Sequence, residues 1–174
     1  MIETARLRLR VPEAGDFDAL HALWSDPVVM RDLGPVKTPA HSEATLARHQ
    51  RYRDSDGLGF WVVELRDEPV VIGFCGLKPG APGTPIEGEL EIGWMFASAH
   101  WGQGYAQEAA RASLDWGWAN RDAAHIVAIT AATNQSSRKL MGRLGMTWFT
   151  DFDHPGFPFD SRWRESTAYR IVRP

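Results

Sequence analysis

The hydrophobic and polar positions in the first third of the chain change from the period of a strand to the period of a helix. Residues 5–11 alternate leucine or valine with arginine, which is the period of two expected for a half-buried strand. From Asp16 to about Asp26 the apolar residues follow helical spacing and are Phe17, Leu20, Leu23 and Trp24. A second helix is predicted from about residue 41 to 53, with Ser42 as its cap.

The middle of the chain has the composition of strands. Residues 60–65 and 70–77 are rich in β-branched and aromatic residues, and the polar segment 66–69 between them suits a hairpin turn. A loop rich in proline and glycine over 79–85 leads to a further strand over 89–96.

Helices and strands alternate in the last third. A long helix is expected from about Gly104 to Asn120, followed by a strand over 125–131 whose small and β-branched residues indicate burial on both faces. Asn134 can cap a short helix that Gly145 ends. The final predicted strands cover 146–152 and 167–172.

The succession of these elements is βααβββαβαββ. It predicts an α/β fold with one mixed sheet and helices packed against it. A length of 174 residues is the usual size of one domain, and 44% hydrophobic with 24% charged residues is ordinary for a globular chain. We therefore expect residues 1–174 to form a single domain.

The composition excludes several kinds of site and partner. Cys75 is the only cysteine and lies in a predicted strand, so disulfide frameworks and thiolate metal sites are excluded and a buried thiol is expected. No apolar run is long enough to predict a membrane span, and the mixed-charge start does not resemble a signal peptide. The net charge of −3 argues against direct nucleic-acid binding. We expect a cytoplasmic protein without a metal, acting on a small molecule or another protein.

The segment Trp101–Gln107, between a strand and the long helix, is the most informative stretch. Gly102 and Gly104 have no Cβ and let the backbone approach a ligand closely, while a helix start offers unpaired amides to an anion. No acidic side chain occurs before Glu108, so backbone amides could bind a pyrophosphate here. The alternative is that the glycines only make a tight turn. The dinucleotide fingerprint and the P-loop sequence do not fit.

A second block, residues 133–146, follows the buried strand. The two blocks together resemble the GNAT superfamily of acyl-CoA-dependent N-acetyltransferases, in which Q/R-x-x-G-x-G/A binds the coenzyme A pyrophosphate and N-x-x-S…L-G-[FM] forms the next helix. The first block matches at Gly104 and Ala106, with Trp101 in place of the family's opening Gln or Arg. The second matches at Asn134, Ser137, Leu144, Gly145 and Met146.

One branch of the superfamily accounts for the tryptophan. The motif W-G-x-G-Y-A-x-E-A over 101–109 resembles the RimJ/RimL-like ribosomal-protein acetyltransferases, as do T-A-R-L-R-L-R over 4–10 and Y-R-I over 169–171. The resemblance implies a GNAT fold that uses acetyl-CoA, held at its pyrophosphate by Gly102, Gln103, Gly104, Tyr105, Ala106 and Gln107.

The resemblance also implies further cofactor contacts. Asn134 and Lys139 would contact the pantetheine and the phosphates, and the backbone amide of Met95 or Phe96 would stabilise the oxyanion. For Asn134 a helix cap is the alternative, and both roles can coexist.

Acetyl transfer to an amine needs a base for the amine proton, and the leaving thiolate benefits from a proton. Glu89 and Glu91 share one face of the predicted strand by alternation, with Gly93 following on that face. The family base is commonly a glutamate on this strand, at a position that Glu91 fits better than Glu89; solvated strand carboxylates are the alternative. Ser137 is the acid that the RimL-like resemblance implies, with helix capping as its alternative.

The acceptor side has three candidates. Trp24 and Met30 lie where the family forms the acceptor wall, and His154 is either a further acceptor-side residue or a turn-capping histidine. We expect direct transfer in a ternary complex to a primary amine, first of all a peptide or protein α-amine, because its pKa of about 8 is below the value of about 10.4 for lysine. A small-molecule amine, or a catalytically silent acyl-CoA-binding module, is the alternative. RimL-like proteins are often dimers, which leaves a homodimer open.

Overall fold

A computed structural model describes all residues, 1–174. Its strands are β1 (Ile2–Glu3), β2 (Leu7–Arg10), β3 (Gly59–Leu65), β4 (Val71–Pro79), β5 (Leu90–Phe96), β6 (His125–Ala131), β7 (Thr147–Asp153) and β8 (Glu165–Val172). Its helices are α1 (Phe17–Ser25), α2 (Pro27–Met30), α3 (Pro39–Asp56), α4 (Tyr105–Asn120) and α5 (Gln135–Arg143), with short 3-10 turns η1 (Ala14–Asp16) and η2 (Ser98–His100). None of the helices combines the length and the apolar composition needed to cross a bilayer.

The eight strands form one mixed sheet in the order β1-β2-β3-β4-β5-β6-β8-β7. All neighbouring pairs are antiparallel except β5–β6, which is parallel and registered at a single pair, Glu91 opposite Val127. Beyond this pair no ladder joins the two strands. The carboxyl end of β5 therefore has a hydrogen-bonded neighbour on the β4 side only.

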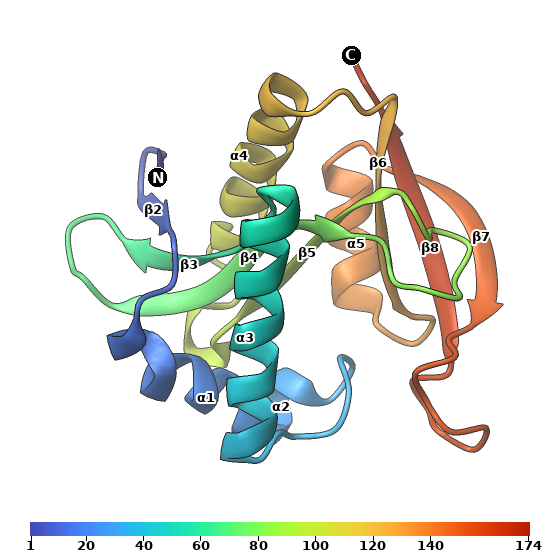
Figure 1. Ribbon diagram of the computed structural model, residues 1–174, viewed down its shortest axis with the longest axis horizontal. Coiled ribbons are helices and arrows are strands. Elements are labelled where there is room, and N and C mark those ends of the chain that lie inside the picture. The colour runs from blue at the N-terminus through green and yellow to red at the C-terminus, as the bar shows by residue number, and fades with distance from the viewer.

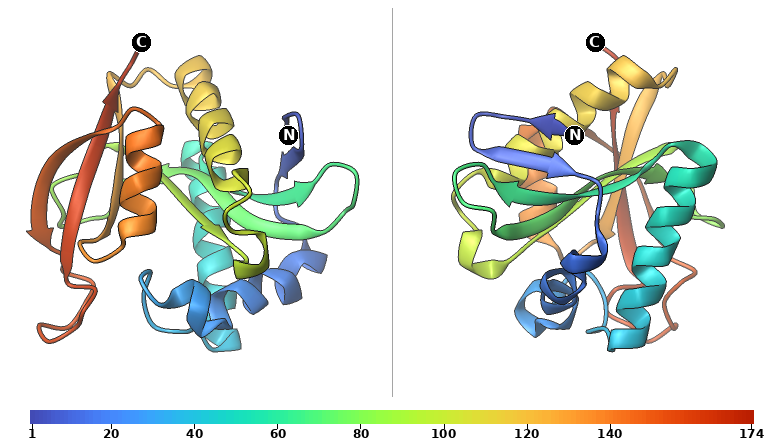
Figure 2. Two further views of the ribbon diagram at one scale, coloured as in Figure 1. Left: turned by 180° about the vertical axis from the view of Figure 1, so that it is seen from behind. Right: turned by 60° about the vertical axis from the view of Figure 1, so that its left-hand side comes forward.

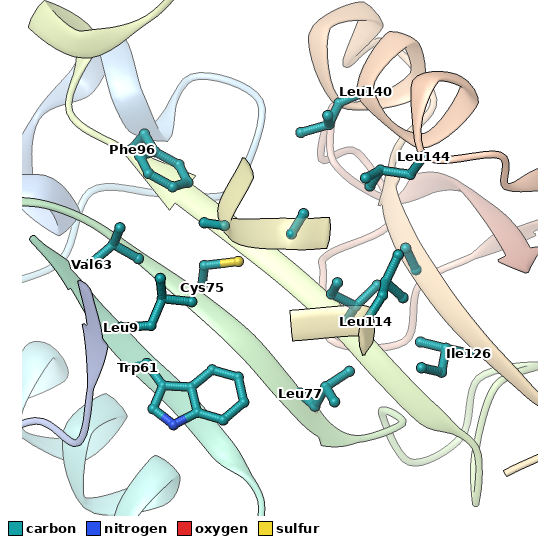
Figure 3. Close-up of a cluster of buried hydrophobic side chains, with 14 of the residues drawn as sticks. Leu9, Trp61, Val63, Cys75, Leu77, Phe96, Leu114, Ile126, Leu140 and Leu144 are labelled. Atoms are coloured by element: carbon teal, nitrogen blue, oxygen red, sulfur yellow. The ribbon is translucent and has the colours of Figure 1, made fainter. Parts of the chain in front are cut away.

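Helices cover both faces of the sheet, as the two opposite views show: α1 and α3 lie on one face and α4 and α5 on the other (Figures 1 and 2). The larger core lies between the sheet and α4 and α5, where Cys75 and Leu114 are fully buried (Figure 3). A smaller core packs Leu20, Leu23 and Trp24 of α1 against the opposite face. The predicted α/β fold with one mixed sheet is confirmed.

One prediction about the first helices is wrong, and one short helix, α2, was not predicted. The second predicted helix begins at Pro39, because the Thr38 hydroxyl accepts the His41 N–H at 3.3 Å; Ser42, the expected cap, is buried with its hydroxyl 2.9 Å from Nδ1 of His21. The Asp26-Pro27 sequence ends α1 but also begins α2. The Asp26 carboxylate accepts the Val28 N–H at 2.7 Å, and proline suits the first helical position because its missing N–H would have no partner there.

Several local predictions are confirmed. β6 spans the predicted residues 125–131, and the β3–β4 hairpin pairs Trp61 with Cys75. The Asn134 side chain caps α5 by accepting the Ser137 N–H at 3.1 Å, and Gly145 takes a left-handed φ of 86° just beyond that helix. Burial raises the pKa of the Cys75 thiol to about 12, as expected for a thiol that packs as a small apolar group.

Candidate functional site

A cavity of about 330 Å³ opens at the carboxyl end of β5, where the ladder to β6 has ended. Its walls come from four segments distant in sequence: the end of β5, the turn Gly102–Gln107, the cavity side of α5, and α2 with the turn that follows it. The divergence of two parallel strands thus leaves a space that the helices on either side line but do not fill.

The glycine-rich turn carries unpaired backbone donors. Gly102 and Gly104 have φ of +76° and +84°, a left-handed conformation that side chains rarely adopt, and Gly104 is the N-cap of α4. The N–H groups of Tyr105, Ala106 and Gln107 donate to no acceptor in the protein. Three free amides at the positive end of a helix dipole fit an anionic group such as the coenzyme A pyrophosphate.

A contact from the start of the chain holds this turn. Arg6 donates to the Gln103 carbonyl at 3.0 Å, lies over the Tyr105 ring at 4.6 Å, and pairs with the Glu108 carboxylate at 2.7 Å. Burial raises the pKa of Glu108, but hydrogen bonds from Thr4 and Arg6 outweigh it and lower the pKa overall. The negative charge of Glu108 is therefore compensated, and a guanidinium lies beside the turn.

Helix α5 supplies two of the predicted residues, and both line the cavity. Asn134 is buried, with Oδ1 accepting the Ser137 N–H and Nδ2 donating to Thr130 Oγ1 at 2.9 Å, so its capping role is real. Ser137 gives only its backbone N–H to that cap, and its hydroxyl makes no hydrogen bond within the protein. The capping alternative therefore does not account for the Ser137 hydroxyl.

The two glutamates predicted to share a strand face differ in position and in partner: Glu91 lies in β5, whereas Glu89 lies in the bend just before Leu90. Glu91 is 5% exposed and forms an ion pair with Lys78, the residue opposite it on β4. Burial raises the pKa of Glu91 above its ordinary value, and Lys78 opposes that rise. Glu89 pairs at 2.9 Å with His125 and is far more exposed. Glu91 lies on the same face of β5 as Met95 by alternation, but about 13 Å along the strand, and does not itself line the cavity.

Of the four remaining cofactor candidates, two line the cavity and two do not. Met95 and Phe96 line the cavity at the end of β5, and the Phe96 carbonyl is held by the Trp101 indole N–H at 2.8 Å. Gln103 and Lys139 do not line it: the Gln103 amide donates to the Ala99 carbonyl, and Lys139 is exposed on α5.

The three acceptor-side candidates also lie outside the cavity lining. Trp24 is buried edge-on against Phe74, and Met30 is buried behind its cavity-lining neighbours in α2. His154 Nδ1 accepts the Gly156 N–H at 3.0 Å, the turn-capping alternative, and burial lowers its pKa.

Sequence reasoning missed several residues that do line the cavity. Val28, Arg31, Asp32 and Leu33 come from α2 and its following turn, which could have been found from Asp26 as a cap and proline at the first helical position. Three further lining residues lie on one face of α5, because they are spaced by four and then three positions along the helix. They are Ser136, Leu140 and Arg143.

Comparisons with known proteins agree with this geometry. The family model described as acetyltransferase (GNAT) domain matches residues 6–147. The uncharacterised protein YkkB of Bacillus subtilis is 36% identical over 82% of this chain and 83% of its own length. The uncharacterised N-acetyltransferase YnaD of the same organism is 29% identical over 98% and 96%. A GNAT-family acetyltransferase from Bacillus anthracis superposes with a TM-score of 0.80 at 26% identity, covering 99% of this chain and 98% of that one.

More distant structures share the fold and differ in the acceptor that their names state. The ribosomal-protein acetyltransferase RimL, solved with coenzyme A, has a TM-score of 0.78 at 16% identity and covers 97% of this chain and 95% of its own. The spermidine N-acetyltransferase of Vibrio cholerae, solved with coenzyme A and spermine, has 0.76 at 21% and covers 98% and 97%.

Proposed function

The chain belongs to the GNAT acetyltransferase family, whose members use acetyl-CoA, and we propose that it acetylates the α-amine of a peptide or protein N-terminus. N-acetyl transfer is the family's activity; the acceptor and the residue roles below are our proposal. We further propose that residues 1–174 act as one domain. We also propose that the chain belongs to the RimJ/RimL-like branch, whose motifs it resembles, and acts on the same class of acceptor.

The single observation that carries the proposal is the cavity at the end of β5. It joins three free helix amides at Tyr105–Gln107, suited to a pyrophosphate, to an apolar wall at Val28 and Leu33, suited to an acceptor. A cosubstrate and an acceptor entering from these two sides would meet at Met95 and Ser137. Such a meeting point is what direct transfer in a ternary complex requires.

We assign three roles in the transfer. Acetyl-CoA supplies, when bound, the thioester carbonyl that the amine attacks. The Met95 or Phe96 backbone amide would donate to the developing oxyanion, and the free Ser137 hydroxyl would protonate the departing thiolate. Glu91, whose pKa burial raises above its ordinary value, would accept the amine proton through a chain of water molecules, because its carboxylate lies outside the cavity lining.

The α-amine is preferred to a lysine side chain or a polyamine on chemical grounds. An N-terminal amine has a pKa of about 8 against about 10.4 for lysine, so a larger fraction is unprotonated and nucleophilic at neutral pH. The RimL structure supports this choice only by its likeness in fold. A small-molecule amine is the second candidate, supported in the same way by the spermidine enzyme.

The experiment is release of free thiol from acetyl-CoA with peptides, amino acids and polyamines, with the acetylated atom located by mass spectrometry. We expect transfer to peptide α-amines, and a slower thiol release in Ser137→Ala with KM for acetyl-CoA little changed. Tight binding of coenzyme A without transfer to any amine would instead identify a silent acyl-CoA-binding module. Acetylation confined to polyamines would reject the peptide acceptor.

A further inference from the structure

The acceptor wall of the cavity contains one carboxylate, and that carboxylate is fully engaged. Asp32 is the only acidic residue in the lining. Its Oδ2 accepts from Arg31 Nε at 3.0 Å, and its Oδ1 accepts from Arg162 Nη2 at 3.2 Å. Two guanidinium groups therefore face one carboxylate, and this wall carries an excess of one positive charge.

Two acidic groups outside the lining are also engaged. The Asp26 carboxylate caps α2, and the Glu91 carboxylate is paired with Lys78. The cavity lining itself therefore offers no unpaired carboxylate to a polycation.

On the acceptor wall, Arg31 has donors without a partner. Only its Nε is used, so the terminal Nη1 and Nη2 groups have no acceptor in the protein, and 59% of the side chain is exposed where it borders the cavity. These two terminal groups form a planar fork that matches the two oxygens of a carboxylate.

The segment between β7 and β8 holds the backbone of Arg31 in place. The Trp163 indole N–H donates to the Arg31 carbonyl at 2.9 Å, and Arg162 reaches Asp32 from the same segment. Phe157 lies beside Gly34, in the turn after α2. In Figure 1 the α2 turn and the segment before β8 both lie at the lower end of the molecule. The Arg31 backbone is therefore held while the outer edge of its guanidinium stays free.

We propose that Arg31 binds a carboxylate of the acceptor, so that the preferred substrate is an amine with a carboxylate close to it. This inference rests on the proposed function, because it concerns the acceptor side of the same cavity. Two sources supply such a carboxylate: the α-carboxylate of a free amino acid, or an Asp or Glu side chain near a peptide N-terminus. Asp32 and Arg162 are positioning residues, and polyamines are poor substrates because they bring only positive charge.

The test compares acceptors that differ in one charge: two peptides with Asp or Asn as the second residue, alanine with alaninamide, and spermidine. We expect kcat/KM to be about tenfold higher for the acidic member of at least one pair, because its KM is lower. A tenfold change in affinity is typical of the gain from a charge-assisted bidentate contact. In Arg31→Gln that ratio should fall to about one. Arg51→Gln, which removes an exposed arginine without an ion pair from α3, should leave the ratio unchanged.

The outcomes separate this inference from the proposed function. Preference for the Asp peptide identifies an acidic N-terminus, and preference for alanine over its amide identifies a free amino acid. Equal kcat/KM for Asp and Asn peptides and for alanine and its amide, or a best rate with spermidine, would overturn the carboxylate inference. Transfer to peptides in that case would leave the proposed function standing, whereas no transfer to any amine would overturn both.

A second variant guards against a folding defect in the first. Arg31→Lys keeps the charge but loses the fork, so it should lower the acidic preference only partly, with an unchanged melting temperature. In the wild type the preference should also fall as salt rises, because the contact is exposed. A preference insensitive to both salt and Arg31→Lys would contradict an ionic contact at this residue.

Discussion

At the scale of single residues, the Glu91–Lys78 pair determines how the proposed base responds to pH. Burial of Glu91 raises its pKa, and the charge of Lys78 opposes that rise. A base must be deprotonated, so kcat/KM should be lost as pH falls through the raised pKa of Glu91. Removing Lys78 removes the group that lowers this pKa. In Lys78→Met the acid limb of the pH–rate profile should therefore move to higher pH.

Glu89→Gln is the matched control, since Glu89 is a nearby glutamate that lies just before β5 and pairs with His125 instead. Glu91→Gln should lower kcat by about a hundredfold or more and remove the acid limb, with KM for acetyl-CoA unchanged. An acid limb that disappears in Glu89→Gln and persists in Glu91→Gln would transfer the role of base to Glu89. Melting curves are needed beside the rates, because an unpaired buried charge costs about 3–5 kcal/mol.

At the scale of elements, the turn before α4 allows backbone strain to be separated from ligand contact. A Cβ on Gly102 would enter open space at φ +76°, and a Cβ on Gly88 would do the same at φ +83°, away from the cavity. Alanine at either position should lower the free energy of unfolding by about 1–2 kcal/mol, the cost of a left-handed residue with a side chain.

Only Gly102→Ala should also raise KM for acetyl-CoA, by about tenfold, because its new methyl group would occupy the ligand's side of the turn. Steady-state kinetics give KM for acetyl-CoA in both variants, and denaturant unfolding gives their free energies of unfolding. Equal KM values in the two variants would mean that the glycine-rich turn only connects β5 to α4 and does not bind the pyrophosphate.

At the scale of the whole molecule, the sheet has a seam between β5 and β6, where one registered pair joins the two halves. The free amides of α4 and the cavity side of α5 come from helices on either side of this seam. A ligand held by both helices should stabilise the native state across it. Coenzyme A at about 100 times its Kd should raise the free energy of unfolding by about 2.7 kcal/mol. For a domain of this size, that increase corresponds to a rise in Tm of about 5–10 °C.

Thermal unfolding with increasing coenzyme A measures this rise, and amide exchange locates it. Protection should increase both at the start of α4 and along α5. Gly102→Ala should need a higher ligand concentration for the same shift in Tm. Protection confined to one helix would show that the ligand does not bridge the seam.

The sequence by itself determined most of the elements and the character of the glycine-rich turn, because these signals are local. The strand over 125–131, the Asn134 cap and the glycine-rich turn depend on neighbours within a few residues, so period and residue type were enough to place them. The one-turn helix α2 was missed because four residues are too few to show a helical period.

Only the tertiary structure decided which side chains face the cavity and which partners they have. The pairing of Glu91 with Lys78 depends on strand register, and the Arg31–Asp32–Arg162 contact joins residues 130 positions apart. Trp24 and Met30 point into the core instead of the cavity, because packing against the sheet set the rotation of their helices. Such contacts arise from how elements pack, and a local sequence pattern does not contain that information.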